Sequence, residues 1–194
     1  MYYTIPMARP KSNDKRNDIL AACYRVIARD GLDASTATIA KEADVASGSL
    51  FTYFPTKAVL YNDVYVSLKT EMIAAAVAGI NSGSSDHEKM HNVWTGWMNW
   101  ALADTDKQRA LDILRASDLL TPETKAFGAE LMKPTIELIE RCGRDGTRTQ
   151  PSLLFINATM GAIANTTMNL MISDPDNAAL YRESGFEAVW KLIS

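Results

Sequence analysis

Residues 35–57 read STATIAKEADVASGSLFTYFPTK, and this stretch predicts two very short helices joined by a tight turn. We expect helices over 36–43 and 47–53, with the turn at 43–46, and a long amphipathic helix over 56–79 directly afterwards. Two short helices held at a crossing angle by a small apolar core form a helix-turn-helix, whose second helix enters the major groove of DNA. The residues expected to form that core are Ile39, Ala40, Ala43, Val45 and Leu50.

The second short helix has a surface suited to DNA. Its sequence, SGSLFTY over 47–53, combines small hydroxyl residues and a glycine with aromatic rings. Hydroxyls and backbone amides at a helix N-terminus bind phosphates, and a threonine methyl group can contact a thymine methyl. We expect Thr52, or Thr36 from the preceding helix, to reach a base edge. The basic segment MARPKS over 7–12 is either an arm that follows an adjacent groove or a terminus that lacks order without DNA.

Charge is distributed unevenly along the chain, whose formal net charge is −3. The first 60 residues carry eight basic and six acidic side chains, a net charge of +2, so the remainder carries −5. This asymmetry indicates that only the first segment faces a polyanion.

The run IAKEADVASGSLFTYFPTK over 39–57 resembles the DNA-binding signature of the TetR family of transcriptional repressors. The arm at Met7 and the ending GFEAVW over 185–190 further resemble RamR-type repressors, which respond to drugs and bile-like compounds. The resemblance implies a homodimer that binds palindromic double-stranded operator DNA and is released by a small hydrophobic or aromatic effector. It also implies that the regulated genes are efflux or multidrug-response genes. By the same resemblance, we expect that the protein is not an enzyme and uses no cofactor.

By this resemblance, Tyr53 and Lys57 contact phosphates, whereas Ser47 and Thr52 contact bases. The full set of residues expected at the DNA is Arg9, Lys11, Thr36, Ser47, Gly48, Ser49, Thr52, Tyr53 and Lys57.

Three positions depart from the family pattern. Asp44 stands where the turn usually has glycine, a substitution that a left-handed conformation tolerates at some cost. Ala46 stands where a capping serine is common, so capping is weaker there or shifts to Ser47. Phe51 occupies a position that is often tyrosine, which removes a hydroxyl contact to phosphate.

The remainder of the chain is predicted to be helical, because apolar residues recur at three- and four-residue steps. We expect an all-α fold with helices over 13–30, 36–43, 47–53, 56–79, 86–103, 106–117, 122–142, 151–173 and 176–193. Pro134 should kink the seventh helix or mark a join within it. Two domains are expected, the arm and helix-turn-helix over 1–56 and a ligand-binding and dimerisation domain over 57–194. The last two helices carry apolar residues on more than one face, which predicts a dimer interface.

Trp94, Trp97 and Trp100 fan across roughly 120° of one helix, which is more aromatic than a core face requires. Tryptophans are nevertheless usually packing residues. The family resemblance places a ligand between the middle helices and favours Trp94 and Trp97. The residues expected at the ligand, which add methionine and polar groups to the aromatic rings, are Tyr65, Lys69, Trp94, Trp97, Thr159, Met160 and Ile163. Lys69 has an alternative interpretation as a solvated surface lysine.

The helix over 56–79 belongs to both halves of the expected molecule. It begins against the DNA reader and carries Tyr65 and Lys69 towards the ligand site about two and three turns further on. We expect ligand binding to tilt this helix and change the separation of the two DNA-reading helices in a dimer.

Residues 87–91 spell HEKMH, which matches the HExxH pattern of zinc metallopeptidases. Glu88 is better explained as half of a capping box with Ser85, and the chain has no other histidine. A third ligand would have to be a carboxylate such as Asp104 or Asp106, so we expect no metal site and no catalytic residues. A helical protein-interaction module would explain the acidic balance but not the helix-turn-helix signature or the basic arm.

The sequence contains no targeting or membrane signal. No apolar run approaches the roughly 18 residues that cross a bilayer, and the first residues lack the layout of a signal peptide. Cys23 and Cys142 have no CxxC spacing and are expected to be reduced. A soluble, cytoplasmic protein is therefore expected.

Overall fold

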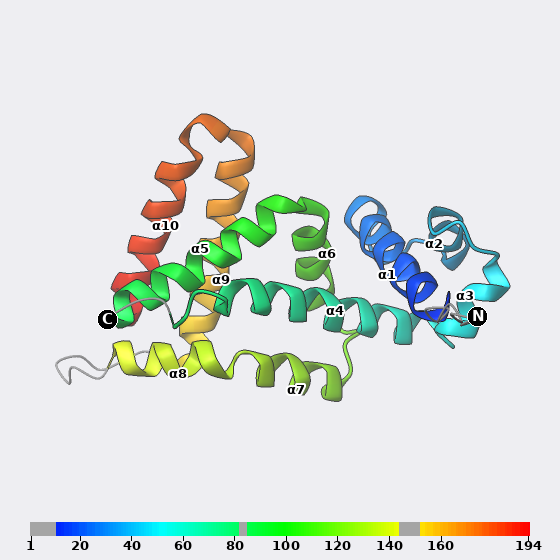
Figure 1. The fold of residues 1–194 in the computed structure, drawn as a ribbon, viewed down its shortest axis with the longest axis horizontal. Coiled ribbons are helices and arrows are strands. Elements are labelled where there is room, and N and C mark those ends of the chain that lie inside the picture. Colours follow the sequence, from blue (N-terminus) through cyan, green and yellow to red (C-terminus); the bar gives the residue numbers. More distant parts are fainter. Residues whose placement is uncertain (1–10, 82–84, 144–151) are drawn as a thin grey trace, which may run out of the picture. The chain divides into compact units, whose positions relative to one another are not determined.

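The computed structural model describes residues 11–81, 85–143 and 152–194, with side chains from residue 14 onward (Figure 1). Within these ranges every regular element is a helix, which confirms the predicted all-α fold. The elements are α1 (Lys11–Asp30), α2 (Thr36–Glu42), α3 (Ser47–Tyr53), α4 (Lys57–Val77), α5 (Asp86–Ala103), α6 (Thr105–Arg115), α7 (Pro122–Leu131), α8 (Lys133–Cys142), α9 (Leu153–Ser173), the short 3-10 helix η1 (Pro175–Asn177) and α10 (Ala178–Ile193).

The helix expected over 122–142 is two helices, α7 and α8. They meet at Met132, and Pro134 lies in the first turn of α8. A proline is tolerated there because the first amides of a helix have no partner within the helix. The predicted join is thus confirmed.

The chain divides into two compact units. Unit 1 consists of residues 1–67 and 106–124, and unit 2 consists of residues 68–105 and 125–194. Helix α4 continues from unit 1 into unit 2 without a break. The compact units do not divide the chain at residue 56, and the functional boundary expected there stays a prediction.

In unit 1, α1 presents a buried stripe at helical spacing that includes Ile19, Cys23 and Val26. Ile39 and Ala40 of α2 and Leu50 of α3 are also buried, as the sequence predicted. Ala43 and Val45, which were expected in the same small core, are only half-buried because they lie at the turn between the two helices.

The turn between α2 and α3 is a Schellman motif. The amide of Val45 donates to the carbonyl of Ala40 at 3.0 Å, and the amide of Asp44 donates to that of Lys41 at 3.2 Å. Asp44 has φ +52°, the left-handed conformation that this motif needs and that glycine adopts most easily. The departure from glycine at residue 44 therefore leaves the turn geometry in place.

Replacing Asp44 by glycine is expected to stabilise the protein by up to about 1 kcal/mol, because glycine removes the cost of the left-handed conformation. Urea unfolding measures the change, with Asp33→Gly, at an exposed position outside this motif, as the control. A loss of stability in Asp44→Gly equal to that of the control would contradict the assigned strain.

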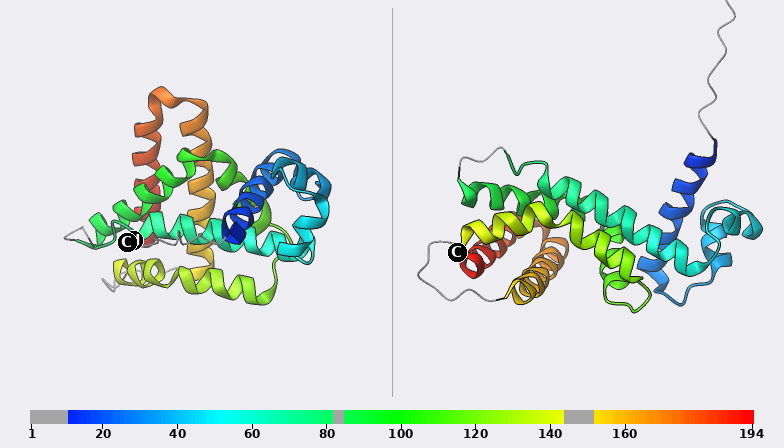
Figure 2. Two further views of the ribbon diagram at one scale, coloured as in Figure 1. Left: turned by 45° about the vertical axis from the view of Figure 1, so that its right-hand side comes forward. Right: turned by 90° about the horizontal axis from the view of Figure 1, so that it is seen from below.

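Unit 2 is built around α5, α8, α9 and α10. Helices α9 and α10 lie side by side, as both Figure 1 and Figure 2 show, and α5 packs against α8, α9 and α10. The shared core includes Trp94, Met160, Met168, Phe186 and Val189. At its start, α5 has the predicted capping box, since the Ser85 hydroxyl accepts from the Glu88 amide and the Glu88 carboxylate accepts from the Ser85 amide.

Two glycines allow helices in unit 2 to approach closely. A Cβ atom at Gly96 of α5 would collide with the backbone carbonyl of Ala75 in α4. A Cβ atom at Gly185 of α10 would collide with the side chain of Thr167 and lie 2.8 Å from Cζ2 of Trp94. Both positions thus need a residue without a side chain.

Neither cysteine has the surroundings of a reactive thiol. Cys23 and Cys142 are unbridged, and Cys23 is fully buried. Burial raises the pKa of Cys23 to about 12 and that of Cys142 to about 11. Because the thiolate is the reactive form, both side chains are expected to be chemically inert.

Candidate functional site

Helix α3 presents an outward face made of small polar residues and one aromatic ring. At about 100° per residue, Ser47, Gly48, Phe51 and Thr52 share an arc of roughly 140°, and all four are exposed. Leu50, on the opposite side, is completely buried and anchors the helix. The seven residues of α3 include none that is ionisable at neutral pH, so nothing on this face repels a base edge or a phosphate.

The first turn of α3 is the end of this helix that would face a phosphate. Its N-cap, Ala46, offers no side-chain cap, as the sequence predicted. Orphan amides at the start of a helix bind anions such as phosphates. The hydroxyl of Thr52 donates back to the carbonyl of Gly48 at 3.4 Å, an arrangement typical of threonine on a helix.

The residues predicted at the DNA are placed as follows. Ser47, Gly48, Ser49 and Thr52 are exposed on α3, whereas Thr36 of α2 and Tyr53 of α3 are half-buried. Arg9 lies outside the described residues, and Lys11 begins α1 with its side chain outside them. Phe51, which departs from the tyrosine of the family pattern, was not expected at the DNA, but its side chain is 45% exposed near the centre of the α3 face.

Lys57 has a structural contact that the sequence did not reveal. Its amine donates to the carbonyl of Leu32 at 2.8 Å and lies 5.2 Å from the ring centre of Tyr61. The hydroxyl of Tyr61 donates to the same carbonyl at 3.1 Å. Lys57 therefore fixes the start of α4 to the segment after α1, and any phosphate contact would be made from this position.

Replacing Lys57 by alanine is expected to weaken binding to all DNA sequences alike and to reduce the slope of log affinity against log salt by about 0.9. It should also lower the free energy of unfolding by about 1–3 kcal/mol, because a hydrogen bond from a charged donor is lost. Filter binding over a salt series and urea unfolding measure the two effects separately. The control is Lys133→Ala, on an exposed lysine of α8 that pairs with Glu130. A slope that stays equal to that of the control would exclude the phosphate role.

Four of the predicted ligand residues come together in unit 2. Trp94 and Met160 belong to the buried core, and Trp97 and Ile163 pack against it. Thr159, one position from Met160 on α9, is half-buried.

The two predicted ligand residues on α4 fall in different units. Tyr65 is buried in unit 1, where burial raises the pKa of its phenol. Lys69 is half-buried in unit 2. Their roles at a ligand stay a prediction.

The three tryptophans of α5 differ in the hydrogen bonding of their indole N–H groups. Trp94 is completely buried and donates its N–H to the carbonyl of Arg182 in α10 at 2.9 Å, so it holds two helices together. The indole nitrogens of Trp97 and Trp100 are also covered, but neither has a hydrogen-bond partner among the described residues. Trp97 therefore fits a binding role better than Trp94, whose indole group is already occupied.

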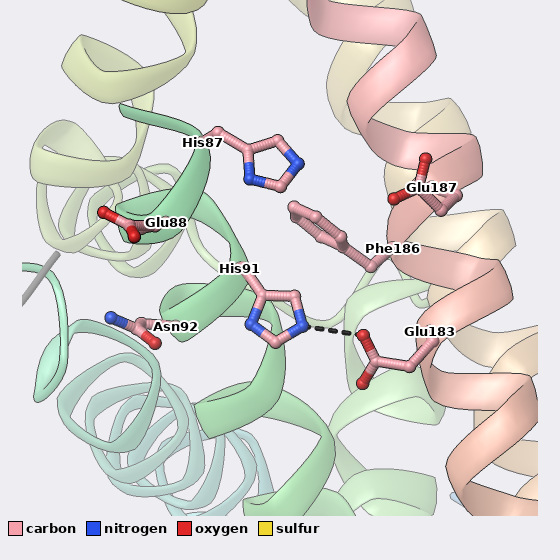
Figure 3. A pocket seen from close by; sticks show the side chains of 7 residues that line it. All are labelled: His87, Glu88, His91, Asn92, Glu183, Phe186 and Glu187. Atoms are coloured by element: carbon pink, nitrogen blue, oxygen red, sulfur yellow. Dashed lines mark hydrogen bonds and ion pairs between the residues drawn. The ribbon is translucent and has the colours of Figure 1, made fainter. Parts of the chain in front are cut away.

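The HExxH pattern is explained by packing between α5 and α10 (Figure 3). The ring of Phe186 lies between the two imidazoles, with centroids 5.1 Å from His87 and 4.7 Å from His91. Nε2 of His91 donates to Glu183 at 2.8 Å, which lowers the pKa of that carboxyl. Among the described residues no group of three or more potential ligands could hold a metal ion. The geometry gives the zinc-peptidase alternative no support.

A surface pocket of about 320 Å³ lies at the same place. Its lining residues are His87, Glu88, His91, Asn92, Glu183, Phe186 and Glu187. The carboxylate of Glu183 is already bonded to His91 and to Arg182, and Glu88 serves the capping box. Glu183 therefore joins α10 to α5 through His91, and Glu88 serves the start of α5.

Comparisons with known proteins identify the helix-turn-helix segment. Residues 19–64 match the model of the family described as bacterial regulatory proteins, tetR family. A tetR-family transcription regulator from Marinobacter aquaeolei VT8 matches with a TM-score of 0.86 and 19% identity, over 96% of this chain and 98% of that one. One from Shewanella sp. PV-4 matches with a TM-score of 0.81 and 23% identity, over 91% and 96%.

A third solved structure is that of a regulator with a bound compound. The TetR-like transcriptional regulator LfrR from Mycobacterium smegmatis, in complex with proflavine, matches with a TM-score of 0.68 and 14% identity, over 93% of this chain and 97% of that one. Residues 19–64 are thus similar to the tetR family of bacterial regulatory proteins, and the chain as a whole shares the fold of solved structures described as TetR-family transcription regulators.

Proposed function

We propose that the protein is a transcriptional repressor that binds palindromic operator DNA as a homodimer and releases it when a small molecule binds unit 2. The observation that carries the proposal is the outward face of α3, where Ser47, Gly48, Phe51 and Thr52 are exposed while Leu50 holds the helix in place. An uncharged helix surface of small polar residues and one aromatic ring can contact base edges. The tetR-family match over residues 19–64 supports the same assignment.

Dimerisation through α9 and α10 is supported by their exposed apolar residues. Helix α9 buries Ile156, Met160 and Met168 on one face, yet Leu154 is 81% exposed on the same helix. On α10, Leu180 is 63% exposed. An apolar surface on both sides of a helix is stable only when both sides are covered. Sedimentation should give a dimer at micromolar concentration, and a monomer would contradict this part of the proposal.

Release by a ligand is supported by the course of α4, which begins at Lys57 beside the DNA-reading segment and ends at Val77 in unit 2. A ligand that favours another orientation of this helix would alter the spacing of the two α3 helices in the dimer. LfrR, with its bound proflavine, is a regulator of this fold that accepts a flat aromatic compound. We extend this property to the present chain and propose efflux or drug-response genes, as in RamR-type repressors, as its targets.

The proposed site of action is bacterial DNA in the cytoplasm. Among the helices within residues 11–81, 85–143 and 152–194, none combines the length and the hydropathy of a membrane span. A protein-interaction module without DNA binding remains the second class of function, but no feature of α3 favours it.

The proposal is tested by selecting binding sites from a random DNA duplex library and measuring their affinity by electrophoretic shift. We expect an enriched palindrome that is bound about a thousandfold or more tightly than random DNA, as for specific regulators at physiological salt. Enrichment of no sequence would contradict DNA recognition. If the protein binds the palindrome and no aromatic compound weakens this binding, only the release step is contradicted.

A further inference from the structure

Two indole groups on α5 are buried without hydrogen-bond acceptors. The nitrogens of Trp97 and Trp100 are covered by protein, and no described residue accepts their protons. The neighbouring Trp94 donates to the carbonyl of Arg182 at 2.9 Å. A buried donor without a partner is costly, and native proteins seldom leave one unsatisfied. An acceptor from outside the chain would satisfy both donors, which lie one helical turn apart.

Trp97 is partly buried and packs against the hydrophobic core of unit 2. The side chains of Val93, Trp94 and Ala101 are buried on the face of α5 to which Trp97 also belongs. Trp97 meets the ring of Trp94 edge to face, with centroids 6.1 Å apart. On α8, which packs against α5, Thr135 is 3% exposed, and no described residue hydrogen-bonds its hydroxyl.

Among the described residues of unit 2, no Asp, Glu, Lys, Arg or His side chain that could neutralise a charged ligand is buried. The hydrophobic core of this unit includes Ile139, Met160 and Met168 from α8 and α9, and its buried polar side chains are the neutral Thr135 and Thr167. Methionines adapt their shape to ligands of different outline. A buried cation would lack a carboxylate partner in this core, and burying an unpaired charge is far more costly than burying a neutral group. An indole N–H is a donor only, so the ligand has to supply the acceptor.

We propose that the effector site of unit 2 selects uncharged aromatic compounds that carry a hydrogen-bond acceptor such as a carbonyl oxygen, to which Trp97 and Trp100 donate. This inference rests on the proposed function, because it names the ligand class of the effector site. The proposed ligand class differs in charge from proflavine, the compound in the LfrR structure.

Three probes with one ring skeleton test this selectivity. Fluorenone carries a carbonyl group, fluorene carries a methylene group at the same position, and 9-aminofluorene carries an ammonium group there at pH 6. Equilibrium dialysis against the full-length protein should give a dissociation constant for fluorenone about tenfold lower than that for fluorene. The constant for 9-aminofluorene should be higher than both.

Conservative variants assign the effect to the two indoles. The double variant Trp97→Phe with Trp100→Phe keeps the rings but removes both N–H groups, so the ratio of the two affinities should fall to about one. Trp190→Phe, on a partly buried ring of α10 that packs against the same core, should leave the ratio unchanged. Circular dichroism and an unchanged melting temperature verify that the double variant is folded.

The outcomes separate this inference from the proposed function. Equal affinities for fluorenone and fluorene in the natural protein, tightest binding of 9-aminofluorene, or binding of none of the three would overturn the ligand class. A ratio that persists in the double variant would overturn the role of Trp97 and Trp100. The DNA selection is a separate measurement, so a protein that prefers fluorenone but enriches no DNA sequence would contradict only the proposed function.

Discussion

Replacing Gly96 by alanine is expected to lower the free energy of unfolding by about 1–3 kcal/mol. In most helices the same change raises stability by about 0.5–1 kcal/mol, because glycine is the more flexible residue. Here the added methyl group would collide with the backbone carbonyl of Ala75, which cannot rotate away as a side chain can. Helices α4 and α5 would have to separate, and urea unfolding measures the cost.

Gly48→Ala provides the matched control. A Cβ atom at Gly48 meets nothing within 4 Å, so alanine should leave stability unchanged or raise it slightly. Opposite signs for the two substitutions would verify the close approach of α4 and α5. Equal, stabilising effects would mean that Gly96 is not a contact point between these helices.

Replacing Gly48 by glutamate is expected to weaken operator binding more than about a hundredfold without unfolding the protein. The new side chain would project from the outward face of α3, where no protein atom lies within 4 Å of its Cβ. A negative charge in the first turn of a helix is compatible with helix stability. Against DNA it costs several kcal/mol through repulsion. Electrophoretic shift with the selected palindrome measures the affinity.

Two controls separate size, net charge and position. Gly48→Gln adds a neutral side chain of the same length and should lose less affinity than glutamate does. Ala126→Glu adds the same charge at an exposed position of α7 and should bind DNA nearly as tightly as the natural protein. Equal affinity of Gly48→Glu and Ala126→Glu would mean that α3 does not face the DNA.

The sequence was sufficient for the features that depend on neighbouring residues. The capping box of Ser85 and Glu88 and the break near Pro134 are local, and both are present. The turn at Asp44 also follows local rules, since its Schellman hydrogen bonds join residues three and five positions apart.

Contacts between residues far apart in the chain could not be predicted. Trp94 and Trp97 look equivalent in sequence, but the acceptor of the Trp94 indole belongs to Arg182, 88 positions away. The interpretation of Lys57 as a phosphate ligand similarly did not include its bond to Leu32, 25 positions earlier. The packing of His87 and His91 on Phe186 depends on α10 and is invisible in the HExxH pattern itself.

Hydroxyl-radical footprinting on the selected palindrome, combined with the mass of the complex, tests the central claim that two α3 helices of a dimer read the operator. We predict two protected half-sites related by a two-fold axis, with centres about 34–36 Å apart, and two protomers for each pair of half-sites. Gly48→Glu should abolish both protections together. A single asymmetric protection by one protomer, or an unchanged footprint with Gly48→Glu, would contradict the claim.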